Sequence, residues 1–198
     1  ATETGTFYTK AELEQLYQYC QKQGLYLFID GARLGVALAA SGLTLNDICS
    51  NSDAFYIGGT KNGAMLGEAL VIQHKDLKPY VRHAIKQSGG LLAKGFVAAI
   101  QFEGLFTDNL FFKLGQHANA MASKLTAGLI QMGIKPIYPV HTNQIFVTLK
   151  SQQVAVLSKQ YAFELWTDHG DTKTIRLVTS WFTTLAMVDA LLNDLKNL

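Results

Sequence analysis

The chain has 198 residues, of which 48% are hydrophobic and 16% are charged, and its formal net charge is +2. A chain of this length can bury about 70% of the surface that its unfolded form exposes, which is enough for a sizeable core. No run of basic residues is present, so the charge pattern gives no indication of nucleic acid or an anionic membrane as a partner.

The sequence has no charged leader followed by an apolar segment, and no apolar run of about 18 residues. We therefore expect neither a signal peptide nor a membrane span. Cys20 and Cys49 fall on the apolar sides of predicted helices, which favours buried free thiols in a reducing cytosol. The composition is apolar for a globular protein, so we expect some surface to be covered by another subunit or by further chain.

The first predicted elements are a helix and a strand. Thr9 and Glu12 form a capping box, and apolar residues then follow at helical spacing until Gly24 ends the helix. The uninterrupted apolar run 25–29 predicts a strand buried on both faces, as in a parallel sheet between helices. This strand ends at Asp30, and the carboxyl edge of such a sheet is where α/β proteins bind their ligands.

The next elements continue the same pattern. Short helices are expected at 34–40 and 44–49, and a second buried strand at 54–57 runs into a glycine-rich turn that carries Lys61. A further strand is expected at 68–72. From 74 to 133 the pattern is helical, and its last apolar stripe predicts a long helix that joins two domains.

The remaining sequence predicts a small α+β unit, with strands at 135–138, 144–149, 163–166 and 175–179 and helices at 152–160 and 184–195. The fold class is therefore α/β: a large domain with a mostly parallel sheet and helices on both faces, then linking helices, then a small α+β domain. We place the boundaries so that residues 1–87, 88–133 and 134–198 form these three parts.

Asp30 and Lys61 are the first candidates for chemistry. Taken alone, each is more often a strand-end acid or a surface lysine, and together they could form an ion pair. They also suit pyridoxal phosphate, in which a lysine binds the aldehyde and a carboxylate faces the ring nitrogen. A second class of function is a non-catalytic, receiver-like module that would use Asp30, Thr60 and Lys61 as a phosphorylation pocket, although Asp30 has no acidic neighbour in the sequence.

Two arginines are candidates for binding an anion. Arg33 follows Gly31 and Ala32, which allow a tight turn and the close approach of a planar ring. Arg176 lies in an apolar strand, where its guanidinium either pairs with an acid of the protein or receives a substrate carboxylate through two hydrogen bonds. The five histidines show no ligand spacing, so we expect no metal site.

Three segments, 28–33, 60–61 and 175–179, with the sequences FIDGAR, TK and IRLVT, resemble the threonine aldolase and β-eliminating lyase family. These are pyridoxal-phosphate enzymes of the aspartate-aminotransferase fold type, and the resemblance covers essentially the whole chain. It implies that Lys61 is the Schiff-base lysine, that Asp30 is the partner of the ring nitrogen, and that Ala32 lies against one face of the ring.

The resemblance implies further roles at the site. Arg33 would contact the cofactor's phenolate oxygen or the substrate carboxylate, and Arg176 would bind that carboxylate. Thr60 would lie beside the cofactor. Lys94, near a helix start that we expect at 88–90, would approach a cofactor from a neighbouring subunit, although helix capping and a solvated lysine are the preferred explanation of this segment. Asn143 also matches a family position, and its expected role is structural.

The sequence departs from the family pattern in two places. In the turn 58–67, asparagine follows the lysine where the family has glycine, and no proline precedes the later glycine. The family also carries a long segment before the equivalent of Ala1, so we expect this chain to be the C-terminal part of a longer, cytoplasmic, homo-oligomeric enzyme. The expected reaction is aldol cleavage of L-threonine or a related β-hydroxy-α-amino acid, with β-elimination and transamination as alternatives.

Overall fold

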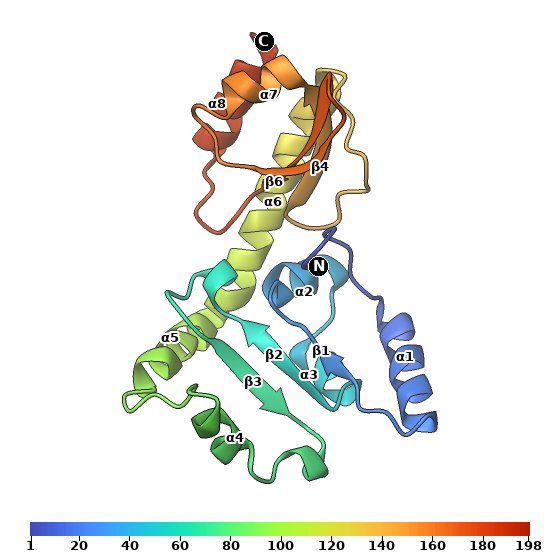
Figure 1. The fold of residues 1–198 in the computed structure, drawn as a ribbon, viewed down its shortest axis with the longest axis vertical. Helices are drawn as coiled ribbons and strands as arrows, with labels where there is room; N and C mark the ends of the chain where they lie inside the picture. Colours follow the sequence, from blue (N-terminus) through green and yellow to red (C-terminus); the bar gives the residue numbers. More distant parts are fainter.

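A computed structural model describes all residues 1–198, which form two regions joined by one long helix (Figure 1). The first sheet has the strand order β1-β2-β3, with β2 parallel to β1 and antiparallel to β3. Its strands are β1 (Phe28–Ile29), β2 (Ala54–Gly58) and β3 (Glu68–Ile72). The predicted strands at 54–57 and 68–72 are therefore confirmed.

The second sheet is antiparallel, with the order β4-β6-β5. Its strands are β4 (Gln144–Lys150), β5 (Glu164–Asp168) and β6 (Thr172–Val178). Helices α7 (Ser151–Leu157) and α8 (Leu185–Lys196) complete this region. The strand predicted at 135–138 is wrong, because this segment makes only an isolated bridge between Pro136 and Val147.

The long helix α6 (Leu110–Gln131) connects the two regions, as predicted. Phe111, in its first turn, belongs to the core beside the first sheet, whereas Leu125 and Leu129 belong to the core beside the second sheet. The helix is thus shared by both cores, and the domain boundaries at 87 and 133 stay a prediction. No helix of the protein is both long and apolar enough to cross a membrane.

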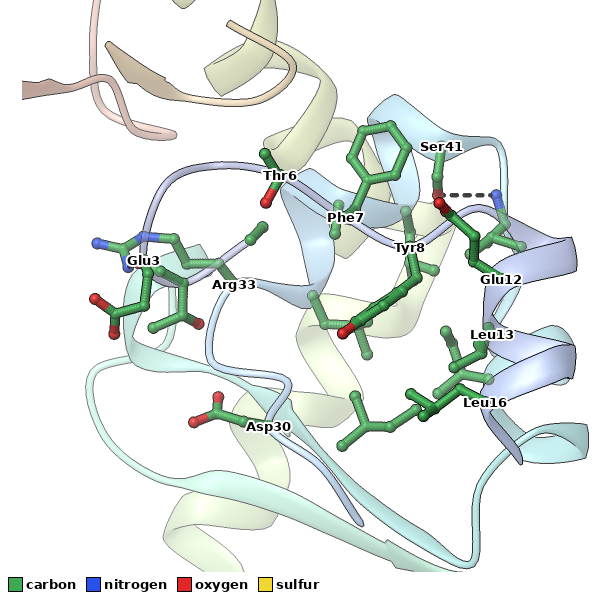
Figure 2. Close-up of a pocket in the computed structure, with 18 of the residues that line it drawn as sticks. Glu3, Thr6, Phe7, Tyr8, Glu12, Leu13, Leu16, Asp30, Arg33 and Ser41 are labelled. Atoms are coloured by element: carbon green, nitrogen blue, oxygen red, sulfur yellow. Dashed lines mark hydrogen bonds between the residues drawn. The ribbon is translucent and has the colours of Figure 1, made fainter. Parts of the chain in front are cut away.

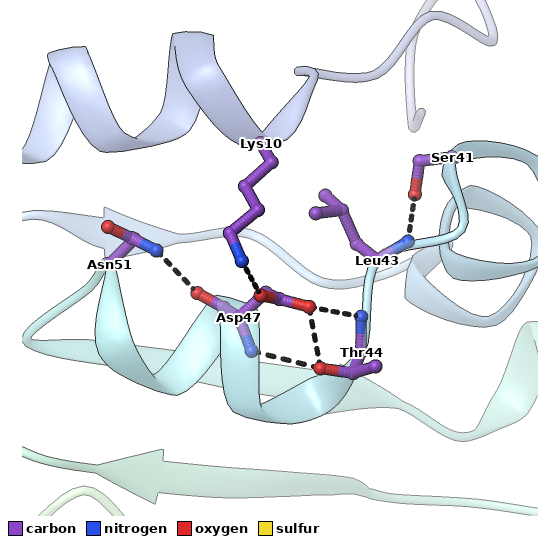
Figure 3. Close-up of polar contacts among 6 residues, drawn as sticks. All are labelled: Lys10, Ser41, Leu43, Thr44, Asp47 and Asn51. Carbon is purple, nitrogen blue, oxygen red and sulfur yellow. Dashed lines mark hydrogen bonds and ion pairs between the residues drawn. The ribbon is translucent and has the colours of Figure 1, made fainter.

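The other helices are α1 (Lys10–Lys22), α2 (Leu34–Ser41), α3 (Leu45–Ser50), α4 (Val81–Gln87) and α5 (Phe96–Phe106), with short 3-10 helices η1 (Thr60–Asn62), η2 (Lys75–Leu77) and η3 (Thr107–Asn109). The capping box of Thr9 and Glu12 is confirmed. A second box of Thr44 and Asp47 starts α3, and the amine of Lys10 lies 2.8 Å from the Asp47 carboxylate, which links α1 to α3 (Figure 3).

The prediction that 25–29 is a strand buried on both faces is wrong. Only Phe28 and Ile29 pair with β2, and the side chains of Leu25, Tyr26 and Phe28 are 55%, 53% and 54% exposed. β1 lies at the edge of the first sheet, where its outer side has no partner strand. Side chains of one sheet face, such as Phe55, pack into the core, while those of the opposite face, such as Phe28, remain open to solvent.

The helix start expected at 88–90 is also wrong, because this segment ends a helix. Ser88 is the C-cap of α4, and the Gly90 amide donates to the carbonyl of Ile85. Gly89 has a φ of 76°, a left-handed conformation that glycine adopts without strain at helix ends. Ser88 therefore offers no free helix N-terminus to a phosphate, and the next helix, α5, begins only at Phe96.

Candidate active site

The loop after β1 is packed tightly against the end of β2. The Gly58 amide donates to the carbonyl of Gly31 at 2.9 Å. A Cβ atom on Gly31 would lie 1.7 Å from the carbonyl oxygen of Tyr56, and one on Gly58 would lie 2.4 Å from that of Ala32. Gly31 does not have a positive φ, so it is this close approach, and not a left-handed turn, that requires glycine. The contact brings the loop of Asp30 next to the turn of the lysine.

Only one oxygen of the Asp30 carboxylate accepts hydrogen bonds from the protein. The Tyr56 hydroxyl donates to its Oδ1 at 2.5 Å and the Ala32 amide donates to the same oxygen at 3.0 Å, which leaves Oδ2 available for another donor. The hydrogen bond from Tyr56, then that from Ala32, and also the charge of Lys61 lower the pKa of Asp30. Conversely, desolvation and the hydrogen bond to Asp30 raise the pKa of Tyr56 to about 12.

The lysine turn is held by hydrogen bonds to β3 and α6. The carboxylate of Glu68, on β3, accepts from the Gly59 amide at 2.8 Å and from the Thr60 hydroxyl at 3.3 Å. The buried amide of Asn62 donates to a backbone carbonyl of α6 at 2.9 Å. Lys61 itself is exposed and takes part in none of the ion pairs of the protein. Its amine therefore projects from a rigid turn without a carboxylate partner.

The two predicted arginines come from different regions but influence each other. Arg33 is the N-cap of α2 and donates to the carbonyl of Thr2 at 2.6 Å. Burial and the charge of Arg176 lower the pKa of Arg33, which indicates that the two guanidinium groups are near each other. Arg176, on β6, donates to Glu164 and, at 3.1 Å, to Gln144. Of the two alternatives for Arg176, the structure shows the pairing with an acid of the protein, which is Glu164.

A cavity of about 720 Å³ lies between the N-terminal segment, α1 and β1 (Figure 2). Glu3, Asp30 and Arg33 lie at one end of it, while Leu13 and Leu16 line the apolar end toward α1 (Figure 2). Neither the lysine of the glycine-rich turn nor the second arginine lines this cavity. Asp30 and Arg33 are the predicted site residues that line the cavity, so the candidate site adjoins its charged end.

The other predicted site residues lie less centrally. Lys94 is exposed in the turn before α5, and its charge is not among those that act on Asp30. Asn143 is buried, and its amide donates to the carbonyl of Thr179 at 2.6 Å, which ties the start of β4 to the end of β6.

The sequence interpretation missed four residues that hold the predicted ones in place: Tyr56, Glu68, Gln144 and Glu164. The sequence signal for Tyr56 was strand alternation, which places it on the open face beside Phe28.

Residues 1–152 match the beta-eliminating lyase family. The chain is 31% identical over 201 residues to a low specificity L-threonine aldolase of Pseudomonas aeruginosa, a match that covers 99% of this chain and 57% of that protein. It is 28% identical over 162 residues to a low specificity L-threonine aldolase of Escherichia coli, covering 80% of this chain and 46% of the other. The two Pseudomonas relatives match 99% of this chain, and the chain spans 57% of the length of these relatives.

The solved structures agree with these relatives. The protein superposes on a threonine aldolase of Leishmania major with a TM-score of 0.95 and 47% identity, covering 99% of this chain and 58% of that one. An aspartate aminotransferase of Thermus thermophilus superposes with a TM-score of 0.72 at 17% identity, covering 100% of this chain and 55% of that one, which is a likeness of fold alone. The predicted fold class and the resemblance are confirmed, and the chain belongs to the beta-eliminating lyase family.

Proposed function

We propose that this chain carries the lysine and the ring-nitrogen carboxylate of a pyridoxal-phosphate-dependent lyase. The observation that carries this proposal is the contact between the loop after β1 and the end of β2, which places Asp30 and Lys61 at one edge of the first sheet. In this arrangement the Lys61 amine would bind the aldehyde carbon of the cofactor covalently. The free Oδ2 of Asp30 would face the ring nitrogen.

The donor set of the site fits this cofactor. The hydrogen bonds from Tyr56 and Ala32 both end on Oδ1 of Asp30 and lower its pKa, which favours the carboxylate form and leaves Oδ2 to hold a proton on the ring nitrogen. Ala32 is small enough for a planar ring to lie against it. Thr60 is anchored by Glu68 at the other side of the lysine. Lys94 would contribute only from a neighbouring subunit.

The reaction that we propose is aldol cleavage of L-threonine or a related β-hydroxy-α-amino acid into glycine and an aldehyde. When bound, pyridoxal phosphate supplies a protonated ring that accepts the electron pair released at the α-carbon. Arg176, helped by Arg33, would bind the substrate carboxylate and hold the Cα–Cβ bond perpendicular to the ring. The bond between Cα and Cβ would break, the hydroxyl proton would leave as the aldehyde forms, and the α-carbon would take up a proton to give glycine. The names of the relatives, L-threonine aldolases, support this reaction over β-elimination and transamination.

We also infer a cytoplasmic, homo-oligomeric protein with no nucleic acid or membrane partner. Cys20 and Cys49 are both free thiols, and free thiols suit a reducing compartment. Large apolar side chains are exposed before and within α5, among them Leu92, Phe96 and Ile100, and a second copy of the protein would cover them.

The experiment that tests the proposed function is an assay of the full-length protein with pyridoxal phosphate and L-threonine. We expect equimolar glycine and acetaldehyde. Release of ammonia with a keto acid would indicate β-elimination, and a dependence on an added keto acid would indicate transamination. Lys61→Ala should abolish the reaction, whereas Lys94→Ala, which removes an exposed lysine elsewhere, should reduce it only slightly if subunits share the site.

A further inference from the structure

The guanidinium group of Arg176 is only partly satisfied by its neighbours. Its Nη1 donates to Gln144 at 3.1 Å, and its Nη2 donates to Oε2 of Glu164. Its Nε is buried and has no hydrogen-bond partner. The ring of Trp166 lies on one side of the group, with its centroid 5.8 Å from the guanidinium carbon. A buried donor without a partner is costly, so a ligand that accepted a hydrogen bond from Nε would remove this cost.

The two polar partners of Arg176 differ in how firmly they are held. Gln144 is buried, and its amide nitrogen donates to the carbonyls of Ala1 at 2.5 Å and Thr2 at 3.2 Å, so both ends of this amide are engaged. The side chain of Glu164 is 52% exposed and lies on the edge strand β5, opposite Arg176. Only the Glu164 end of this ion pair is exposed, since the Arg176 side chain is 15% exposed, and solvent screens the pair and leaves the Glu164 side chain free to move at that end. Glu164 is therefore the partner that can leave.

A substrate carboxylate would fit Arg176 better than Glu164 does. A guanidinium presents Nε and one Nη along the same edge, spaced to match the two oxygens of a carboxylate. Glu164 reaches only Nη2 and leaves Nε without a partner. An α-carboxylate that accepted from both nitrogens would satisfy the buried Nε and would need only the exposed pair to break.

Glu164 also has a reason to remain while no substrate is bound. The charge of Arg176 acts on Arg33 across the site, and such like charges repel each other. Glu164 and Glu3 are the carboxylates whose charges oppose this effect at Arg33. A carboxylate at position 164 thus neutralises the pair of arginines until another carboxylate takes its place.

We propose that Glu164 is a displaceable counter-ion of Arg176, a specificity-determining residue that the substrate's α-carboxylate replaces on binding. This inference rests on the proposed function, because it takes Arg176 as the carboxylate-binding residue. It adds that binding is a competition between two carboxylates for one guanidinium. A ligand without a carboxylate gains nothing from displacing Glu164.

The test uses Glu164→Gln in the full-length protein loaded with pyridoxal phosphate. The amide keeps the size of the side chain and removes its charge, so the Kd for glycine and the KM for L-threonine should each fall about two- to fivefold, with kcat nearly unchanged. The Kd for ethylamine, which lacks a carboxylate, should stay the same. Asp168→Asn is the matched control, since it removes a carboxylate from the same strand that pairs with Lys173 and not with Arg176.

Four results obtained with an active wild-type protein would overturn this inference alone. Unchanged constants in Glu164→Gln would show that no competition takes place. Higher constants would show that Glu164 helps to hold Arg176 for the substrate. An equal gain for ethylamine, or the same gain in Asp168→Asn, would show a general charge effect. Failure of the proposed function is recognised separately, because the wild-type protein itself would then neither bind glycine nor cleave L-threonine. The inference about Glu164 would fail with it.

Discussion

The two sheets of this protein differ in how completely they are covered. In the second sheet, Ile145, Val147 and Ile175 are 0% exposed and pack in one core with α6, α7 and α8. In the first sheet, Phe55 is buried on the inner face, but Leu70 and Phe28 on the outer face are about half exposed. One sheet therefore has a closed core of its own, and the other has an open face and an open edge.

The difference separates the main source of stability from the residues to which we assign the proposed chemistry. The closed second sheet carries Arg176 on β6, and under the proposed function this residue would bind the substrate. The open first sheet carries Asp30 and Lys61 at one edge, and local contacts from Tyr56 and Glu68 hold them there without a complete core around them.

Removing a buried side chain next to the second sheet should cost far more stability than removing one from the open face of the first. Leu129 is fully buried on α6, so Leu129→Ala should lower the free energy of unfolding by about 3–5 kcal/mol. Leu70→Ala removes the same atoms from a half-exposed position and should cost less than about 1 kcal/mol. Denaturant unfolding followed by circular dichroism measures both losses, and equal losses would mean that the two sheets are equally closed.

Replacing Arg176 should impair the use of the substrate and leave the fold of the second sheet intact. Truncation of one side of a desolvated charge pair typically costs about 2–5 kcal/mol, so Arg176→Ala should reduce kcat/KM for L-threonine correspondingly. Arg176→Lys keeps the charge but cannot make two parallel hydrogen bonds, and it should recover only part of this loss. Steady-state kinetics and cofactor titration check the prediction. An unchanged kcat/KM in Arg176→Ala would remove this residue from the site.

Loss of the Glu68 carboxylate should loosen the lysine turn and leave the rest of the first sheet intact. Glu68→Ala removes the acceptor of the Gly59 amide and of the Thr60 hydroxyl, a local loss of about 1–2 kcal/mol. Hydrogen exchange of the Gly59 amide should therefore accelerate about tenfold, since 1.4 kcal/mol corresponds to a factor of ten. Glu68→Gln, which retains an acceptor oxygen, is the control. Equal exchange rates in the wild-type protein and in Glu68→Ala would show that the turn is held by other contacts.

The smallest expected effect is a change of protein stability with pH that arises from Tyr161, which packs against the core beside the second sheet. The hydrogen bond to Asp194, together with burial, raises the pKa of Tyr161 to about 12. An unfolded tyrosine has a pKa of about 10, so the contribution of this phenol to stability is full below about pH 10 and is lost as the pH rises through about 12. The stability difference between the wild-type protein and Tyr161→Phe should therefore shrink between these pH values. A constant difference would contradict the assigned hydrogen bond.

Local patterns predicted the parts of the fold that depend on local structure. The capping box at Thr9, the long helix and the turn of Lys61 all follow from residues close together in the sequence. The burial of 25–29 could not be predicted in this way, because an apolar run does not reveal whether a neighbouring strand and helix cover it. The segment 88–90 was assigned to the wrong end of a helix, since serine and glycine occur at both ends.

The contacts that hold the site were the least predictable part. Tyr56 reaches Asp30 from 26 residues away, and Gln144 reaches the carbonyl of Thr2 from 142 residues away. No spacing rule connects such pairs, because they form only when two strands or two regions come together. The residue types of Asp30, Lys61 and Arg176 suggested the chemistry, but the partner of Arg176 had to come from the structure.

The most direct test of the central claim is to identify the lysine that binds the cofactor. The full-length protein is loaded with pyridoxal phosphate, reduced with borohydride so that the covalent bond becomes permanent, and digested for peptide mapping. We predict a single modified peptide, which contains Lys61, and retention of this label in Lys94→Arg but not in Lys61→Arg. A label on another lysine, or no label on the peptide that contains Lys61, would contradict the account.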